Sequence, residues 1–363
     1  MGNLATPNSV QKLQTALHAK AKSEAGFRFY ALYDKIYRTD ILSHAYAQCR
    51  SNKGAPGADG QDFSDIEAYG LERWLSELAL ALREETYRPE PIRRVFIPKA
   101  NGKLRPLGIS TLRDRVCMTA AMLVLDPIFE ADLPSEQYAY QPGRNAQQAA
   151  EEVKDRLYLG HTDVVDADLA DYFGSIPHPE LMQSLARRIV DRRVLHLIKM
   201  WLECPVEETD DRGGKKRTTE AKDNGRGIPQ GSPISPLLSN LSMRRFVLAW
   251  KKLGLERRLG SRIVTYADDL VILCKRGKAE EALQRMREIM GKLKLTVNEE
   301  KTRICKIPEG EFPDFLGSRL GGCIRRARGK LDWATDRRRY VSGAWSRRFT
   351  RWPPKRPHGC PRP

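Results

Sequence analysis

The stretch RIVTYADDLVILCKRG, residues 262–277, sets two adjacent carboxylates between two apolar arms. The arms, 262–265 and 270–273, are rich in β-branched residues, which favour half-buried strands. The tetrad YADD between them would then form the tip of a hairpin, although it contains no Gly, Asn or Pro to ease a turn. Carboxylates on a rigid hairpin suit Mg²⁺, which proteins usually bind through one or two carboxylates. An ordinary solvated turn is the alternative, and the tetrad alone does not separate the two.

A second acidic segment, TDVVDADLADYF at 162–173, predicts a buried strand. Asp168 lies 100 residues before Asp268, so only the fold can bring the two together. If one sheet holds this strand and the hairpin, their carboxylates converge and repel one another unless cations neutralise them. Two metal ions about 3.5–4 Å apart would do so and would clamp the oxygens of a phosphoryl transfer. Asp166 and Asp171 are competing candidates on the same segment.

The charge of the chain predicts an anionic partner. Its 363 residues carry a net charge of +17, with a pI near 9.6. From Arg319 onward, fourteen Lys or Arg residues face two Asp or Glu, so about +12 of that charge lies in the last 45 residues. Nucleic acid is the expected partner, because Lys and Arg that neutralise phosphates dominate such binding. A merely basic protein is the alternative.

Cysteine spacing and hydropathy bear on the compartment. The seven cysteines are scattered without a C-x-x-C pair, which argues against a zinc module and for a reducing setting. The N-terminus lacks an apolar signal core, and no run approaches the ~18 apolar residues of a membrane span. We therefore expect a cytoplasmic, nucleic-acid-associated protein without a membrane partner.

Turn signals and periodicity predict a mixture of helices and short strands. An Asn101-Gly102 turn predicts a hairpin within 91–109. Residues 207–225 are polar and predict an exposed hairpin tip or loop, and the chain from Gly321 is expected to be disordered or conditionally ordered. Apolar spacing predicts helices over 11–50, 62–86, 111–133, 178–203 and 279–294.

Several blocks occur in the order seen in reverse transcriptases. These are NKGAPGADG, YRPEPIRRVFIPKANGKLRPLGISTLRDRV, YAYQPGRNAQQA, VVDADLADYFGSIPH, GIPQGSPISPLLSN, TYADDLVIL, LKLTVNEEKTRI and FPDFLGS. Over roughly residues 10–320 the chain resembles the bacterial group II intron-encoded reverse transcriptases. The resemblance implies an α+β, right-hand polymerase with an antiparallel palm sheet that carries the YADD hairpin. The N-terminal extension and fingers would cover 1–155 and the palm 156–318, while 319–363 would be a basic tail or truncated thumb.

The resemblance assigns catalysis to three aspartates. Asp168, Asp268 and Asp269 match the catalytic, metal-binding carboxylates, and the backbone carbonyl of Leu169 matches a further metal contact. The implied cofactor is a pair of Mg²⁺ ions, with Mn²⁺ as an alternative.

Other matched residues would bind the nucleotide. Lys99 and Arg105 match the cations that grip the triphosphate, and Gln230 matches a contact to the sugar and base pair. Phe173 matches the bulky residue that excludes a ribose 2′-OH, which favours DNA as product over RNA. Lys301 matches a lysine proposed to protonate pyrophosphate. Without the resemblance, the cations would be surface charges and Phe173 a core residue.

Primer and template contacts are implied for Gly231 and for Phe315, Leu316 and Gly317. The implied reaction is RNA-directed DNA synthesis, in which dNTPs are added to a primer 3′-OH. Partners would be an RNA template, a DNA or RNA primer, and a structured group II intron RNA. Alternatives are an RNA-binding maturase or remnant with little polymerase activity, and a stand-alone enzyme of host defence or repair.

The chain departs from the family pattern in places. Tyr140-Gln141 replaces Phe-Arg, and Met118 replaces the usual Gln after the Asp-Arg pair, which bears on template or nucleotide handling. Family members continue with a three-helix thumb, whereas the sequence pattern of the last 45 residues does not predict three helices. A truncation or frameshift and a divergent minimal thumb both remain open.

Overall fold

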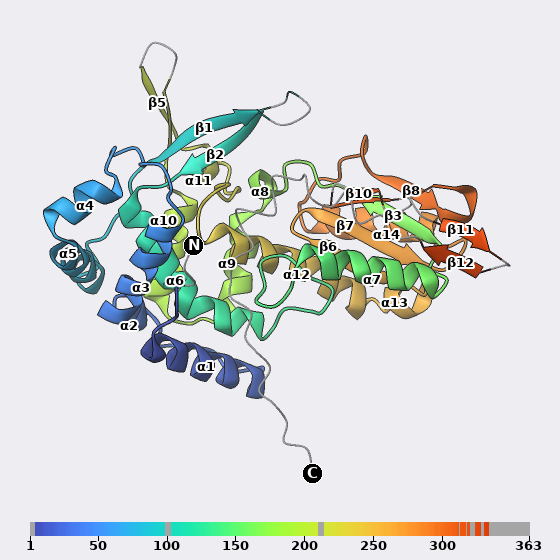
Figure 1. The fold of residues 1–363 in the computed structure, drawn as a ribbon, viewed down its shortest axis with the longest axis horizontal. Helices are drawn as coiled ribbons and strands as arrows, with labels where there is room; N and C mark the ends of the chain where they lie inside the picture. Colours follow the sequence, from blue (N-terminus) through green and yellow to red (C-terminus); the bar gives the residue numbers. More distant parts are fainter. Residues whose placement is uncertain are drawn as a thin grey trace. The chain divides into compact units, whose positions relative to one another are not determined.

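The computed structural model describes residues 4–98, 102, 104–209, 214–311, 313–316, 318–319, 324–327 and 330–333. Lys99, Gly317 and most of the predicted tail therefore lie outside the described residues. Backbone contacts divide the chain into two compact units, each built from two segments (Figure 1). Unit 1 comprises 1–133 and 173–242, and unit 2 comprises 134–172 and 243–363. The boundaries proposed above for fingers, palm and tail stay a prediction.

Unit 2 contains the sheet that carries the YADD hairpin. Its four strands run in the order β6-β7-β3-β8, and every neighbouring pair is antiparallel, which confirms the predicted antiparallel sheet. The predicted strand over 162–173 is shorter than expected, because the chain turns after Ala167 and a short helix begins at Tyr172. The elements are α7 (Ala146–Tyr158), β3 (Asp163–Ala167), β6 (Arg262–Tyr266), β7 (Asp269–Cys274), α14 (Ala279–Lys292) and β8 (Arg303–Lys306).

Both faces of this sheet are covered by helices. Val164, Val271 and Leu273 point to one face and form a buried cluster with residues of α7. Residues that alternate with them, such as Val165 and Ile272, are fully buried on the opposite face. Helix α14 contacts β3, β7 and β8 but contributes nothing to the α7 cluster, so it covers that opposite face. Burial on both sides explains the continuous apolar arms of the hairpin.

Unit 1 holds a second four-stranded sheet, in the order β2-β1-β4-β5. Strands β1 (Ile92–Pro98) and β2 (Leu104–Ile109) form the hairpin predicted around Asn101-Gly102. The polar insert predicted as a hairpin tip or loop forms the antiparallel pair β4 (Val206–Thr209) and β5 (Lys215–Thr218). Strand β4 extends the first hairpin by pairing in parallel with β1.

Three of the predicted helices are interrupted. The region 11–50 forms α1 (Asn8–Ser23), α2 (Tyr33–Ile36) and α3 (Thr39–Ser51), and 62–86 forms α4 (Phe63–Tyr69) and α5 (Leu71–Arg83). The region 178–203 forms α9 (His178–Ala186) and α10 (Arg192–Leu202). Gly70, with a φ of 105°, ends α4, and the side chain of Asp191 caps α10. Apolar spacing does not reveal such breaks, because caps and turn residues decide them.

The helix predicted over 111–133 forms α6 (Leu112–Glu130). The other elements are α8 (Tyr172–Ser175), α11 (Glu220–Asp223), α12 (Ser235–Lys252), α13 (Leu255–Arg258), the 3-10 turn Ile307–Glu309, β9 (Asp314–Phe315), β10 (Ser318–Arg319), β11 (Ile324–Ala327) and β12 (Lys330–Trp333). The cysteines among the described residues, Cys49, Cys117, Cys204, Cys274 and Cys305, are buried thiols. Among the described helices, none combines the length and the apolar character that a membrane span requires.

A buried arginine fixes the chain after α1 within unit 1. Arg188 is 4% exposed, and its guanidinium pairs with Asp132 at 3.1 Å. It also donates to the backbone carbonyl oxygens of Ala21, Glu24, Ala25 and Phe27. These carbonyls lie in the last turn of α1 or just after it, where the backbone has no N–H partner within the helix. The guanidinium of Arg188 supplies the missing hydrogen bonds. Arg188 therefore joins the N-terminal helix to the segment after α9.

Arg188→Met should lower the free energy of unfolding by about 3 kcal/mol or more, because it leaves the largely buried carboxylate of Asp132 and several backbone carbonyls without this donor. Urea unfolding followed by circular dichroism measures this change. Arg187→Met is the matched control, since Arg187 is exposed on the neighbouring position and should cost less than about 0.5 kcal/mol. Equal midpoints for the two variants would contradict the role of Arg188.

Candidate active site

The register of the unit 2 sheet brings two of the predicted carboxylates together. Strand β3 pairs with β7 so that Ala167 lies opposite Leu270. Continued by one residue, the same register sets Asp168 opposite Asp269. Residues opposite one another in an antiparallel pair have Cβ atoms about 4.5–5.5 Å apart and point to the same face. Two carboxylates about a hundred residues apart in sequence thus meet at one end of the sheet.

The turn between β6 and β7 is the predicted hairpin tip. Tyr266 pairs with Asp269, which leaves Ala267 and Asp268 as a two-residue loop. Ala267 has a φ of 56°, a left-handed conformation that costs free energy for any residue but Gly. Asp268 is exposed and Asp269 is partly buried. Non-glycine residues in such conformations concentrate at functional sites, and this turn fixes Asp268 beside Asp269.

The segment that follows α14 clamps Asp168. Asn298 Nδ2 donates to Asp168 Oδ2 at 2.9 Å, and Lys301 Nζ lies 3.1 Å from the same oxygen. The backbone N–H of Asn298 donates to the carbonyl of Asp168 at 2.9 Å, and Thr302 Oγ1 accepts from the Asp168 N–H at 3.3 Å. Both the main chain and the side chain of Asp168 are therefore held.

The structure thus places Lys301 at the carboxylate, with 64% of its side chain exposed. Sequence reasoning missed Asn298 and Thr302, although both lie in the block LKLTVNEEKTRI beside Lys301. The only available signal was this proximity in sequence to Lys301.

The other acidic candidates have different surroundings. Asp166 points to the same face as Asp168, and its carboxylate lies 3.3 Å from the guanidinium of Arg303. Asp171 is exposed in the turn after β3, with a φ of 41°. The side chain of Leu169 is buried, and its backbone bridges to Val297.

Crowding of the carboxylates changes their protonation. Burial, followed by the charges of Asp268, Asp168 and Asp166, raises the pKa of Asp269 from 3.8 to about 7, while Lys301 acts in the opposite direction. Burial and the charge of Asp269 raise the pKa of Tyr266 as well. The negative charge at this end of the sheet is therefore poorly compensated by the protein itself.

The carboxylates suit a divalent cation by their chemistry. Oxygen donors are the ligands that Mg²⁺ prefers, and a cation would lower the raised pKa of Asp269. Within the described part of the chain, no group of three or more His, Cys, Asp or Glu side chains has the geometry to hold a metal. One oxygen of Asp168 is engaged by Asn298 and Lys301. The carboxylate oxygens match a divalent cation by their chemistry, while the described side chains are not arranged as a group of three or more metal ligands.

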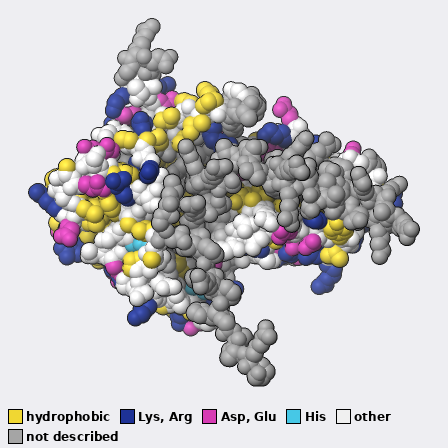
Figure 2. Space-filling view, viewed as in Figure 1, with side chains coloured by type: hydrophobic (Ala, Val, Ile, Leu, Met, Phe, Trp, Pro, Cys, Tyr) yellow, Lys and Arg dark blue, Asp and Glu magenta, His cyan; other side chains and the backbone are white. Residues whose placement is uncertain are grey.

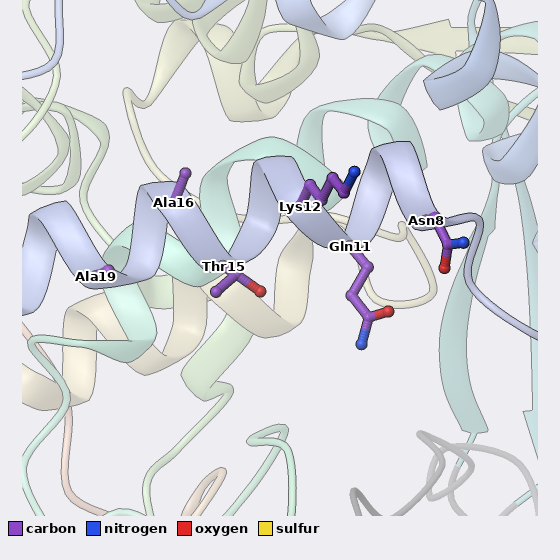
Figure 3. A pocket seen from close by; sticks show the side chains of 6 residues that line it. All are labelled: Asn8, Gln11, Lys12, Thr15, Ala16 and Ala19. Carbon is purple, nitrogen blue, oxygen red and sulfur yellow. The ribbon is translucent and has the colours of Figure 1, made fainter.

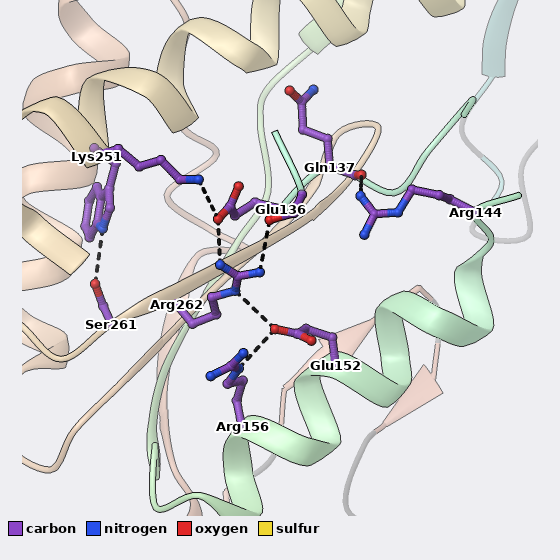
Figure 4. A network of polar contacts seen from close by, with 10 residues as sticks. Glu136, Gln137, Arg144, Glu152, Arg156, Lys251, Ser261 and Arg262 are labelled. Atoms are coloured by element: carbon purple, nitrogen blue, oxygen red, sulfur yellow. Dashed lines mark hydrogen bonds and ion pairs between the residues drawn. The ribbon is translucent and has the colours of Figure 1, made fainter. Parts of the chain in front are cut away.

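A buried ion network supports the edge of the sheet (Figure 4). Glu136 is fully buried, and its carboxylate pairs with Arg262 at 2.6 Å and with Lys251 at 2.8 Å. Arg262 also pairs with Glu152 on α7 at 3.1 Å. Backbone hydrogen bonds join Thr265 to the segment around Glu136, so the edge of β6 is paired rather than open. The network fixes the strand that leads directly into the YADD turn.

Among the described residues, three predicted nucleotide contacts, Arg105, Phe173 and Gln230, belong to unit 1. The N–H of Ile228 donates to the carbonyl of Phe173 at 2.8 Å, and the N–H of Gly108 donates to the carbonyl of Gln230 at 2.7 Å. The end of β2 at Gly108 therefore lies beside the Pro-Gln-Gly turn, and the residues just before that turn lie beside Phe173, whereas Arg105 lies near the start of the strand. Phe173 is partly buried, which differs from an ordinary core Phe.

Gly231 is required in this turn for steric reasons. Its φ is 103°, and a Cβ here would lie 2.8 Å from the carbonyl oxygen of Gly108. Met118, which departs from the family pattern, accepts a hydrogen bond from the hydroxyl of Ser232 at 2.8 Å. The substituted position thus contacts the residue that follows the turn.

The predicted primer segment is partly a core element. Phe315 is 1% exposed and joins the α7 cluster of unit 2, so packing accounts for its apolar character. Leu316 packs against the same cluster with a φ of 58°. Gly317 lies outside the described residues. A contact of this segment with a primer stays a prediction.

A separate groove lies along α1, and its described lining contains no carboxylate. It encloses about 410 Å³ and, among the described residues, is lined by Asn8, Gln11, Lys12, Thr15, Ala16 and Ala19 (Figure 3). None of these side chains is acidic, so the described part of this groove offers no carboxylate to a metal. The carboxylates of unit 2 remain the candidate catalytic site.

Comparison with known proteins agrees with the motifs. The model of the family described as "Reverse transcriptase (RNA-dependent DNA polymerase)" matches residues 97–333, which include the three candidate aspartates. The chain belongs to the reverse transcriptase family. Protein YkfC of Escherichia coli K12 is 33% identical over 351 residues, which cover 86% of this chain and 88% of that relative.

Other relatives of this reverse transcriptase family member are longer. The group II intron-encoded protein LtrA of Lactococcus lactis is 28% identical over 281 residues, which cover 76% of this chain but 43% of LtrA. Among solved structures, a chain of a partial Cas6-RT-Cas1–Cas2 complex aligns with a TM-score of 0.40 and 24% identity, covering 72% of this chain and 42% of that chain. A structural similarity of this size supports no conclusion about activity or partners.

The stability of the metal-free protein should fall as pH rises from about 4 through 7. The folded state holds a proton on Asp269 up to about pH 7, whereas the unfolded chain releases it near 3.8, so ionisation opposes folding in this window. Asp269→Asn cannot ionise, and at pH 8 in a chelating buffer it should be more stable than the wild type. Thermal denaturation between pH 4 and 8 measures the difference.

Asp34→Asn is the control for that comparison, because Asp34 is a half-exposed carboxylate in unit 1. Mg²⁺ added at pH 8 should stabilise the wild type and have less effect on Asp269→Asn, since ligands that bind only the folded state stabilise it. Identical pH profiles for the wild type and Asp269→Asn would contradict a raised pKa of Asp269 in the folded protein.

Proposed function

We propose that this reverse transcriptase family member is an RNA-directed DNA polymerase of group II intron type. The observation that carries the proposal is the meeting of Asp168 with the YADD carboxylates at one end of the unit 2 sheet, which the β3–β7 register supports. Its reaction would be the template-directed addition of dNTPs to the 3′-OH of a DNA or RNA primer on an RNA template. The family match supports this class of reaction.

Asp168, Asp268 and Asp269 would hold two Mg²⁺ ions, or Mn²⁺, and the carbonyl of Leu169 would add a ligand. When bound, the metals supply charge stabilisation for the attacking hydroxyl and the leaving pyrophosphate. The contact of Asn298 with Asp168 orients the carboxylate, leaving its second oxygen for a ligand. Lys301, whose Nζ lies 3.1 Å from that carboxylate, would give a proton to pyrophosphate.

Unit 1 would supply the nucleotide contacts. Arg105 can bind phosphate oxygens through its forked guanidinium, together with Lys99. Phe173 would block a ribose 2′-OH and so select deoxynucleotides. Gln230 would contact the sugar and base pair, and Gly231 lets the main chain of that turn approach closely.

A second candidate function is RNA binding in intron splicing. It is favoured by the names of relatives, which include a group II intron-encoded protein and plant nuclear intron maturases. This chain spans 43% of the first and 15% of the second. A role in splicing would use the basic character of the chain and would not need the carboxylates.

Primer extension on an RNA template with Mg²⁺ and dNTPs tests the polymerase. Asp268→Asn/Asp269→Asn should reduce the rate about a hundredfold or more, because the charges that hold the metals are lost. Chelation should stop the wild type, and added Mg²⁺ should restore it. Asp34→Asn, on the surface of unit 1, should extend the primer at the wild-type rate.

Retained DNA synthesis by the double variant would contradict the catalytic assignment. No synthesis by a folded wild type that still binds RNA would favour the splicing role instead.

A further inference from the structure

Unit 1 contains a groove lined by cations, and none of its lining residues belongs to the candidate catalytic site. It encloses about 260 Å³ between the turn after α5, helix α2 and helix α10. The charged and titratable side chains among its described lining are Arg88, Arg192, Arg193, His196 and Glu85. The described lining thus contains three guanidinium groups and an imidazole but a single carboxylate.

The floor of the groove is rigid. Tyr33 and Tyr87 line it and are only 4% and 1% exposed. The hydroxyl of Tyr33 donates to the carbonyl of Leu82 at 2.8 Å. The hydroxyl of Tyr87 donates to Asp114 at 2.5 Å and accepts from the indole N–H of Trp201 at 3.1 Å. Both hydroxyls are satisfied within the protein, so the rings form a fixed wall behind the cations.

The cations are weakly neutralised. Arg193 lies 3.9 Å from Glu85, and an exposed pair at that distance contributes little. It also lies 3.9 Å from the buried Asp191, whose carboxylate accepts hydrogen bonds from the backbone N–H groups of Leu32 and Tyr33. Arg88 donates through one nitrogen to the carbonyls of Glu85 and Tyr87, which leaves its other N–H groups for a ligand. Within the described chain, the side chain of Arg192 makes no hydrogen bond or ion pair. The groove therefore keeps most of its positive charge.

The molecular face in Figure 2 carries charges of both signs. Its Lys and Arg side chains lie at several separate places, and Asp and Glu side chains lie among them. A concave site where arginines outnumber acidic groups is a better binding site for an anion than such a mixed surface.

We propose that this groove binds phosphate groups of an RNA backbone, as a nucleic-acid contact additional to the polymerase site. Guanidinium groups match phosphate oxygens in a bidentate fork. The tyrosine rings are buried, and Arg193 lies over Tyr33 at 5.1 Å, so neither ring is open to stack on a base. Recognition would therefore be of the backbone and independent of sequence. The identity of the nucleic acid as RNA rests on the proposed function, whereas the phosphate chemistry does not.

The test is the salt dependence of binding to a single-stranded RNA oligonucleotide, measured by fluorescence anisotropy without dNTPs or divalent metal. Arg192→Gln/Arg193→Gln removes two phosphate contacts, so the slope of log K against log salt should become shallower by about 1.4. Affinity near 0.15 M salt should fall roughly tenfold. The control, Arg187→Gln/Lys199→Gln, removes two exposed cations from the same region that do not line the groove, and it should keep the wild-type slope.

Equal slopes for the groove variant and its control, with unchanged melting temperatures, would overturn the proposal. Calorimetric titration with inorganic phosphate and with ATP distinguishes the source of the phosphate. Micromolar binding of either ligand that disappears in the groove variant would also overturn the RNA assignment in favour of a small phosphate ligand. Since binding is measured without synthesis, these outcomes are independent of whether the protein polymerises DNA.

Discussion

The repulsion between carboxylates at one end of the unit 2 sheet is the constraint that the rest of this unit must satisfy. Asp168 follows β3 and Asp269 begins β7 at the same end of the sheet, and burial together with the charges of Asp268, Asp168 and Asp166 raises the pKa of Asp269 to about 7. Such an arrangement persists only where the surrounding structure holds it against its own electrostatics. A cation bound among these side chains would remove the penalty, which links the local instability to the proposed chemistry.

Contacts on both faces and at both edges of the sheet hold the carboxylates in place. Helices α7 and α14 bury its two faces, so the strands cannot shift without exposing apolar side chains. Glu136, with Arg262 and Lys251, fixes the edge strand that leads into the turn. Asn298 fixes Asp168 from the opposite edge through both its backbone and its side chain. The left-handed Ala267 is a local strain that this support sustains.

The sequence predicted the parts of the site that follow from local pattern. β-Branched arms with a polar tip define the hairpin at Tyr266–Asp269, and the apolar run before Asp168 defines its strand. Their convergence was predicted only on condition that one sheet holds both. Asn298 could not be predicted, because an amide in a loop shows no periodicity and acts through a contact with a residue 130 positions away.

The helix breaks near Gly70 and Asp191 were missed because capping interrupts a continuous apolar pattern. The structural role of Arg188 was also missed. Its acceptors are backbone carbonyls, which every residue carries, so the sequence gives no sign of which ones it contacts. The cationic groove combines residues of α2, the turn after α5, and α10, so only the fold could show that they share a surface.

The most direct test of the metal-binding role of these carboxylates is a titration of the purified protein with Mn²⁺, followed by electron paramagnetic resonance. Asp168→Asn removes a carboxylate that lies opposite Asp269, whereas Asp171→Asn removes an exposed carboxylate three residues further on. Weaker Mn²⁺ binding in Asp168→Asn, with wild-type binding in Asp171→Asn, is the predicted result. Unchanged binding in Asp168→Asn would contradict the assignment of the metal to this end of the sheet.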